Sequence, residues 1–395
     1  MNDKIICGQC PAVYEPEEID AYVGESKAST LALLNDRSSA AGETTQGRRL
    51  LRRALGLPGT PTASGPNVEV LARFKAYTFR CPRGHVVDGN PGAQFPLAVL
   101  GASGSSKSHI LPALVCELDD LMALSGIGVT LSDTLHTNPR LNQNVIRLYR
   151  QGRDLPPTPP GQVSGPFGYK LLVGKGRADP DAARYSLLLF DVAGEDLAST
   201  VRIAEKAPFM VLSQALLVLI DPVGFLPTQF DDGRIVNRRD RVNAARDVRQ
   251  GIRVIAETLA EVWGLRSSLE LKVPICFVIS KADSIEWGGV LDWGRATSSV
   301  LGAPDLAGAL SQSSTDTRDA FVVLGGELVA DEIEERFDPA YVRWTAASAT
   351  GAMPLEVEDA DGNQWTDFPE PNGVALSMLQ LLDLAGMLPA PSPGD

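Results

Sequence analysis

Residues 95–108, Phe-Pro-Leu-Ala-Val-Leu-Gly-Ala-Ser-Gly-Ser-Ser-Lys-Ser, decide the fold that the sequence predicts. They begin as an apolar run, break into a loop of small residues, and lead into an apolar pattern with helical spacing. That order predicts a strand, a phosphate-binding loop and a helix, because phosphates need backbone N–H donors, the positive end of a helix, one ammonium and one hydroxyl for Mg²⁺. The predicted phosphate-binding residues are Gly101, Ala102, Ser103, Gly104, Ser105, Ser106, Lys107 and Ser108.

The loop departs from the pattern G-x-x-x-x-G-K-[ST] at Ser106, where a glycine is expected. A residue other than glycine that is held at positive φ costs roughly 1–2 kcal/mol, which a loop fixed by its neighbours can tolerate. Taken alone, a loop of this kind could also be purely structural. The rest of the chain has to decide between the two interpretations.

The charge balance and the hydropathy exclude some partners. The chain has 395 residues, with 36 Lys and Arg against 49 Asp and Glu, whereas nucleic-acid binders usually carry a basic footprint. No apolar run approaches the ~18 residues of a membrane helix, and residues 1–7 show no signal-peptide pattern. We therefore expect a cytoplasmic protein that binds neither nucleic acid nor membranes.

Two short motifs near the start of the chain have the spacing of zinc knuckles. They are Cys7-Gly-Gln-Cys10 and Cys81-Pro-Arg-Gly-His85, and they contain three of the chain's five cysteines and one of its three histidines. Zn²⁺ takes four thiolate or imidazole ligands, and two residues on a tight turn can supply half of them. We expect a structural Zn²⁺ on Cys7, Cys10, Cys81 and His85, with isolated thiols as the alternative.

The predicted domain boundaries follow from these motifs. Apolar residues at helical spacing over 16–57 predict a helical insertion between the two knuckles. A zinc ribbon with this insertion is expected over 1–92, a phosphate-loop domain over 93–388, and a flexible tail over 389–395.

A buried strand at 185–190 leads to Asp191-Val-Ala-Gly194. A carboxylate at the end of such a strand can hold Mg²⁺ through water. Gly194 can bring its N–H against a γ-phosphate with no side chain in the way. The D-x-x-G pattern is common by chance, but its position after a buried strand and downstream of the phosphate loop favours this role.

Further buried strands at 215–220 and 273–279 end at Asp221-Pro222 and Ser280-Lys281-Ala282-Asp283. The carboxyl ends of parallel strands are where α/β sheets bind ligands. A carboxylate there can accept both N1–H and N2–H of guanine, a donor pair that adenine lacks, and the Lys281 stem can lie over the base. The structural alternative for residues 280–283 is a polar helix start.

A last strand at 341–345 leads to Ser348-Ala349. Small residues there would let backbone N–H groups approach the carbonyl of the base. A glycine-capped turn explains this segment nearly as well.

The order of these motifs resembles that of the Ras-like and translation-factor-like P-loop GTPases, the TRAFAC class, over residues 96–388. The resemblance implies an α/β fold, a Ras-like three-layer sandwich with a mostly parallel sheet. It also implies GTP or GDP and Mg²⁺ as cofactors. The positions it assigns to them are Lys107 on the β/γ-phosphates, Ser108 and Asp191 on Mg²⁺, Gly194 on the γ-phosphate, and Ser280, Lys281, Asp283, Ser348 and Ala349 at the base.

The zinc ribbon and the long spacers look like those of bacterial double-GTPase families, which are associated with multi-component conflict or signalling systems. That likeness implies a protein partner, such as a second GTPase or an effector. We see no internal repeat, so a second GTPase would be another chain.

Two positions depart from the family pattern: Ser280 stands where Asn or Thr is usual, and Glu195 where many members carry a water-orienting Gln. Glutamate offers no N–H to the γ-phosphate and adds negative charge beside it. We therefore expect slow intrinsic hydrolysis that a partner stimulates.

A switch threonine that would contact Mg²⁺ should precede the predicted strand at 169–173. Thr158 is the first choice, because the surrounding prolines keep its segment extended. Thr130, Thr134 and Thr137 are alternatives, and a plain surface linker is an equally good interpretation of the segment around Thr158.

The sequence thus predicts a GTP-hydrolysing switch protein. The alternatives are a nucleotide-bound scaffold with little hydrolysis and a P-loop ATPase. Helical patterns over 242–265, 315–337 and 372–388 predict the covering layers, with Gly325-Gly326 dividing the second.

Overall fold

The computed structural model describes residues 5–6, 13–14, 20–23, 77–84, 86–87, 94–101, 105–121, 130–133, 146, 148–150, 167–173, 183–191, 213–226, 238–262, 265–351, 355–358, 364–367 and 371–388. Seven strands form its main sheet, in the order β12-β11-β10-β6-β9-β8-β7. Their bounds are β6 Gln94–Gly101, β7 Thr130–Asp133, β8 Phe167–Val173, β9 Ala183–Asp191, β10 Ala215–Ile220, β11 Ile275–Ile279 and β12 Val342–Ala346.

The five strands from β12 to β9 are parallel, whereas β8 is antiparallel to both of its neighbours. The parallel strands are continuous apolar runs, as a sheet covered on both faces requires. Along β6, Leu97 and Val99 face one hydrophobic core, and Ala98 and Leu100 face the other. This alternation follows from the two-residue period of a strand.

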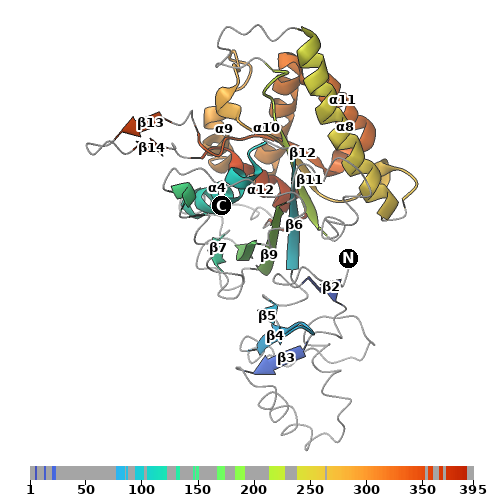
Figure 1. Ribbon diagram of the computed structural model, residues 1–395, viewed down its shortest axis with the longest axis vertical. Helices are drawn as coiled ribbons and strands as arrows, with labels where there is room; N and C mark the ends of the chain where they lie inside the picture. The colour runs from blue at the N-terminus through green and yellow to red at the C-terminus, as the bar shows by residue number, and fades with distance from the viewer. Residues whose placement is uncertain are drawn as a thin grey trace, which may run out of the picture.

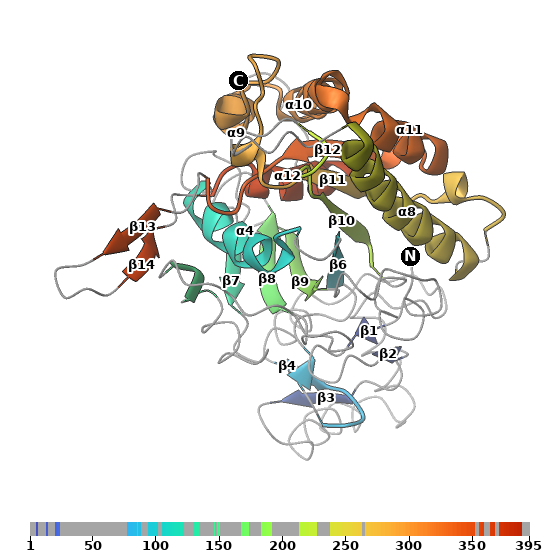
Figure 2. The ribbon, with the colours of Figure 1, turned by 45° about the horizontal axis from the view of Figure 1, so that its top comes forward.

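Helices cover both faces of the sheet (Figure 2). The core on one face includes side chains of α4 (Lys107–Leu121) and α12 (Val374–Leu384), and the core on the other face includes those of α8 (Arg238–Val262) and α11 (Glu327–Arg336). The remaining helical elements are η4 Ser268–Glu270, η5 Ala282–Ser284, α9 Trp293–Leu301, α10 Leu306–Phe321, η6 Val322–Gly326 and η7 Pro339–Tyr341. The parallel strands with helices on both faces fit the three-layer α/β fold that the sequence predicts.

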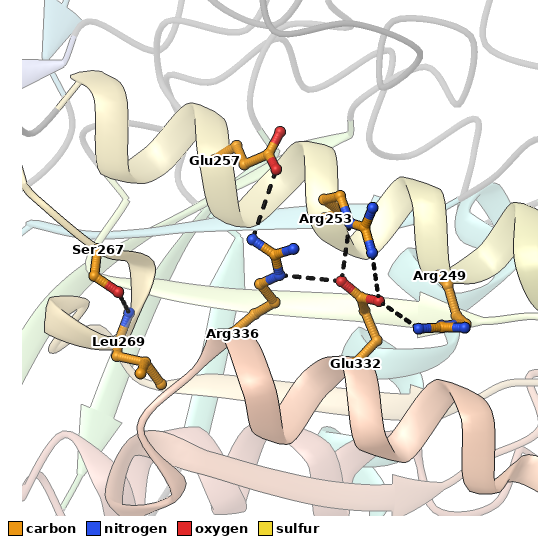
Figure 3. A network of polar contacts seen from close by, with 7 residues as sticks. All are labelled: Arg249, Arg253, Glu257, Ser267, Leu269, Glu332 and Arg336. Atoms are coloured by element: carbon orange, nitrogen blue, oxygen red, sulfur yellow. Dashed lines mark hydrogen bonds and ion pairs between the residues drawn. The ribbon is translucent and has the colours of Figure 1, made fainter.

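A buried carboxylate joins α8 to α11 (Figure 3). Glu332 of α11 is fully buried and accepts hydrogen bonds from Arg249 and Arg253 of α8 and from Arg336 one turn further along α11. Burial alone raises the pKa of Glu332, but these hydrogen bonds outweigh it and lower the pKa to about 2. The carboxylate is therefore charged at neutral pH and holds the two helices together.

Three small sheets lie outside the main one (Figure 1). β1 (Ile5–Ile6) pairs with β2 (Val13–Tyr14), and β4 (Tyr77–Arg80) lies between β3 (Asp20–Val23) and β5 (Val86–Val87). β13 (Leu355–Glu358) and β14 (Gln364–Asp367) form a hairpin that projects from the domain in both views.

The helical prediction for 16–57 is wrong at its start. Asp20–Val23 is the strand β3 and pairs with β4, because a short segment with Tyr22 and Val23 suits a pleated strand. The other residues of that insertion lie outside the described residues.

The structure confirms that residues 315–337 are helical, but the first helix begins earlier than predicted. The helix α10 begins at Leu306, where Asp305 caps it by accepting from the Gly308 N–H, and Gly325, at φ 109°, separates it from α11 as the sequence predicts. No helix in the described part of the chain is both long and apolar enough to cross a bilayer.

Candidate functional site

The five parallel strands end at one edge of the sheet, which we call the carboxyl edge. Gly101 at the end of β6 is in register with Leu219 on β10, and Asp191 at the end of β9 with Val99 on β6. Ile279 at the end of β11 lies beside Ile220 and Ala346, the last residues of β10 and β12. Because neighbouring strands are ~4.8 Å apart, the segments that follow these ends are close enough to bind one ligand.

Gly101 and Lys107 have positions that suit the predicted phosphate loop. A Cβ on Gly101 would lie 2.5 Å from the Ser105 hydroxyl and 3.0 Å from Leu219, so only glycine fits where the loop leaves β6. Lys107 begins α4, is 8% exposed, and donates from Nζ to the Gly101 carbonyl at 2.7 Å. The ammonium therefore lies against the start of the loop. Ala102, Ser103 and Gly104 lie outside the described residues.

Ser106 has the positive φ expected of the glycine that it replaces. Its φ is 64°, and its carbonyl accepts from the N–H groups of His109 and Ile110, which starts α4. In the described residues, the other non-glycine residue at positive φ is Lys281, at 53°. Strained backbone of this kind persists where the surroundings fix it and is typical of ligand sites, and both residues lie at the carboxyl edge.

The residues predicted to lie beside the γ-phosphate and Mg²⁺ are described only in part, and Ser108 is half-buried in the first turn of α4. Asp191 ends β9 next to the strand of the phosphate loop, as predicted. Thr158, Gly194 and Glu195 lie outside the described residues. Phe167, where β8 begins, pairs with Leu189 near the carboxyl edge, so the chain enters β8 from the side on which Thr158 is predicted to act.

Thr130, one of the alternative switch threonines, is not at this edge. It begins β7 and pairs with Leu172, which in turn pairs with Arg184 near the start of β9. Because β7 is three strands from β6 and Thr130 lies at its amino end, this position is far from the end of β6. Thr134 and Thr137 lie outside the described residues.

Lys281 lies where two strand ends meet. Its Nζ forms an ion pair with Oδ2 of Asp221, which follows β10, at 2.7 Å. Oδ1 of Asp221 accepts the N–H of Val223 and so fixes the turn after β10. The sequence placed Asp221 at a strand end but gave no sign that it would bind Lys281.

Ser280 is fully buried and donates from its hydroxyl to the Ile220 carbonyl at 3.0 Å. The Ser280 side chain thus ties β11 to β10.

Asp283 and the loop 347–351, which we call the base loop, lie next to one another. The N–H of Ala282 donates to the Ala347 carbonyl at 3.1 Å. Asp283 is partly exposed and has no hydrogen bond or ion pair with the described residues. The hydroxyl of Ser348 accepts the N–H groups of Thr350 and Gly351, whereas the Ala349 N–H has no acceptor in the described part of the chain. A carboxylate acceptor and an amide donor are therefore available at this end of the edge.

Of the four predicted zinc ligands, Cys81 is described. It is buried at the end of β4, on a tight turn closed by the Gly84 N–H on the Cys81 carbonyl, with Gly84 at φ 82°. The turn has the shape that a knuckle needs. Cys7, Cys10 and His85 lie outside the described residues, among which no group of three or more His, Cys, Asp and Glu side chains could hold a metal.

Comparison with known proteins gives structural likenesses alone, since no family model and no curated protein matches the chain. The G domain of the T. maritima FeoB iron transporter matches 74% of this chain and 99% of its own at 10% identity and a TM-score of 0.26. The signal recognition particle receptor SRb-GTP/SRX complex from Chaetomium thermophilum matches 68% and 94% at 13% identity, with a TM-score of 0.29.

The GTP-bound GTPase-like domain of S. cerevisiae Ski7 matches 75% of this chain at 14% identity and a TM-score of 0.30, and this chain spans 50% of its length. These TM-scores are low. The description of the fold therefore stands on the strand order and on the strand β6 and the helix α4 that follows it.

Proposed function

We propose that this chain binds a guanine nucleotide together with Mg²⁺ and hydrolyses GTP to GDP and phosphate. One observation carries the proposal. The residues of four predicted motifs, including Lys107, Asp191 and Asp283, follow or end neighbouring parallel strands at the carboxyl edge. A ligand that extends from phosphates to base would lie along that edge.

The phosphates would bind at the start of α4. The first turn of α4 has no acidic residue, so the partial positive charge of the helix terminus favours an anion there. A phosphate would compete with the Gly101 carbonyl for the Lys107 ammonium.

Mg²⁺ fits the donors at this point. Ser108 is half-buried in the first turn of α4, and the backbone of Asp191 lies in the strand next to β6. A hydroxyl and a carboxylate are the oxygen donors that Mg²⁺ prefers. When bound, the ion would supply positive charge beside the β- and γ-phosphates.

Guanine would bind between η5 and the base loop. Asp283 would accept N1–H and N2–H of the base, and the Ala349 N–H would donate to its 6-oxygen. The stem of Lys281 would lie over the base plane. Adenine offers neither the donor pair nor the carbonyl, so this arrangement favours GTP over ATP.

In hydrolysis a water oxygen attacks the γ-phosphorus in line, and the bond from phosphorus to the β–γ bridging oxygen breaks. Lys107 would offset the charge on the transferring group. Glu195 cannot donate an N–H to that group, so we propose slow turnover that a protein partner stimulates. Loss of the γ-phosphate would release the segments at Thr158 and Gly194, and the chain would act as a switch.

A second candidate is a nucleotide-bound scaffold with little hydrolysis. Its support is that Ser106 replaces the glycine of the phosphate-loop pattern and that Glu195 replaces a water-orienting side chain. In either case we propose that Cys7, Cys10, Cys81 and His85 hold a structural Zn²⁺, and that the zinc ribbon docks a protein partner.

Binding and turnover can be tested separately. Isothermal titration with GDP, GTP and ATP, with and without Mg²⁺, should give tighter binding of the guanine nucleotides and a Mg²⁺ dependence for GTP. Single-turnover hydrolysis should then give slow release of phosphate. Equal affinity for ATP and GTP would favour an ATPase, and tight GTP binding without phosphate release would favour the scaffold.

A further inference from the structure

Two buried side chains outside the predicted nucleotide motifs support the base loop. One bonds to the loop directly, and the other bonds to the start of α12, which pairs with the loop. Tyr149, from the helical segment 148–150, is 5% exposed, and its hydroxyl donates to the Ala349 carbonyl. Burial, and then repulsion from Cys116 and Glu117 in their ionised forms, raise the pKa of Tyr149, so the hydroxyl stays a proton donor. The bond fixes the peptide that follows Ala349, next to the one whose N–H would face the base.

The second side chain, Glu117, lies on α4, the helix that begins at Lys107. Its carboxylate is 6% exposed and accepts the N–H of Gly373 at 3.1 Å and that of Ala375 at 2.8 Å. These N–H groups belong to the start of α12, where no side chain of α12 itself provides a cap. Glu117 therefore replaces the usual N-cap from another helix.

Asn372 connects this capped terminus to the base loop. Its N–H and carbonyl pair with the carbonyl and N–H of Ser348, at 3.0 and 2.9 Å. Gly373, at φ 79°, lies so close behind β12 that a Cβ there would be 2.2 Å from the Ala346 carbonyl. A displacement of the start of α12 would therefore be passed to Ser348 and Ala349.

We propose that Tyr149 and Glu117 are positioning residues for guanine, which hold the base loop so that the Ala349 N–H meets the 6-oxygen of the base. The inference rests on the proposed function. Because Glu117 and Lys107 share α4, the helix that would bind the phosphates also sets the position of the base loop. Discrimination between bases then depends on two side chains outside the K-x-D motif.

The first test compares Tyr149→Phe with Tyr341→Phe, which removes a hydroxyl at the opposite end of β12. Dissociation constants are measured for GDP and for 6-thioguanosine diphosphate, which keeps both donors for Asp283 but has a sulfur, a weak acceptor, in place of the 6-oxygen. Tyr149→Phe should weaken GDP binding about 3- to 10-fold, the value of one hydrogen bond. For the thio analogue, the logarithm of the fold increase in the dissociation constant should be less than half of that for GDP. Equal losses for both ligands, or none, would overturn the proposal.

The second test needs no nucleotide. Hydrogen–deuterium exchange of the amides at 348–351 should be faster in Tyr149→Phe and in Glu117→Gln, which loses one of two acceptor oxygens. It should be unchanged in Tyr341→Phe and in Glu270→Gln, which alters an exposed glutamate on η4.

Together the two tests distinguish a failure of the positioning role from a failure of the proposed function. Unchanged exchange in both variants would contradict the positioning role whether or not GDP binds. Faster exchange in a protein that binds no guanine nucleotide would contradict the proposed function and, with it, the link to guanine.

Discussion

Lys281 Nζ lies 2.7 Å from Oδ2 of Asp221, and this ion pair joins the ends of β11 and β10 at the edge where we propose that the base binds. Both side chains are partly exposed, so the pair adds little to the stability of the fold. Its effect is on geometry, because it sets the direction of a lysine whose backbone is held at positive φ.

Asp221→Asn should therefore weaken GDP binding about 2- to 5-fold with little change in thermal stability, since partly exposed pairs contribute up to ~1 kcal/mol. Fluorescence titration with GDP measures the first effect and calorimetry the second. Asp316→Asn, at an exposed position on α10, is the control. A large loss of stability with unchanged affinity would show that the pair serves the fold.

Asp283→Asn should change which base is preferred. An asparagine amide offers one acceptor and one donor, so it matches the N1–H and 2-oxygen of xanthine and loses one hydrogen bond to guanine. We expect GDP affinity to fall and xanthosine diphosphate affinity to rise, each at least ~10-fold. Competition between the two nucleotides measures the ratio. If guanine stayed preferred by the same factor, another residue would recognise the base.

Lys107→Met should abolish most of the phosphate-dependent affinity. Hydrogen bonds from a charged group are worth ~1.5–3 kcal/mol, which corresponds to a loss of about 10- to 100-fold for GTP. Affinity for guanosine should not change, because the nucleoside has no phosphate for Lys107 to bind. Lys272→Met, at an exposed lysine before β11, serves as the control. Equal losses for GTP and guanosine would contradict the assignment.

Ser106→Gly should raise the stability of the nucleotide-free protein. The substitution removes a strain of ~1–2 kcal/mol and adds ~0.4–1 kcal/mol of chain entropy to the unfolded state. A net gain of about 1 kcal/mol would raise the thermal midpoint by ~2 °C. Ser105→Gly, which removes a buried hydroxyl, should lower it. A decrease for both variants would mean that the Ser106 side chain makes a contact that outweighs the strain.

Glu332→Gln should destabilise the fold in a pH-dependent way. The pKa of Glu332 is lowered from 4.5 to about 2, so the charged carboxylate stabilises the folded state above pH 4.5, and this contribution is lost as the pH falls toward 2. At pH 7 the loss should be on the order of 2 kcal/mol, because partly exposed guanidinium groups lose hydrogen bonds to a charged carboxylate and the buried amide satisfies them less well. Urea unfolding at several pH values measures it, with Asp331→Asn on the exposed side of α11 as the control. A difference that persisted unchanged at pH 2 would contradict the ionic origin.

The buried strands could be predicted from the sequence because each is a continuous apolar run that ends in polar residues. The run 215–220 coincides with β10, and 185–190 lies within β9. A helical pattern such as that of 242–265, between two buried strands, indicates that the strands are parallel, so the meeting of strand ends at one edge could also be predicted. The positive φ of Ser106 follows from the pattern that it interrupts.

The supports of the base loop could not be predicted in this way. Tyr149 and Ala349 are 200 residues apart, and Glu117 and Ala375 are 258 apart. The sequence periodicities of helices and strands relate residues that are only a few positions apart. A buried Tyr or Glu in a helix gives no sign of a partner so distant in the sequence. The hairpin of β13 and β14 was missed because its strands are short and rich in acidic residues, which have low strand propensity.

The bridge between Ser348 and Asn372 also has an evolutionary consequence. It pairs a residue that precedes β13 with one that follows β14, and so closes the segment that carries this hairpin. During evolution the segment between Ser348 and Asn372 can therefore change in length or sequence while the bridge keeps its geometry. The same segment would accept a fluorescent reporter or a fused peptide.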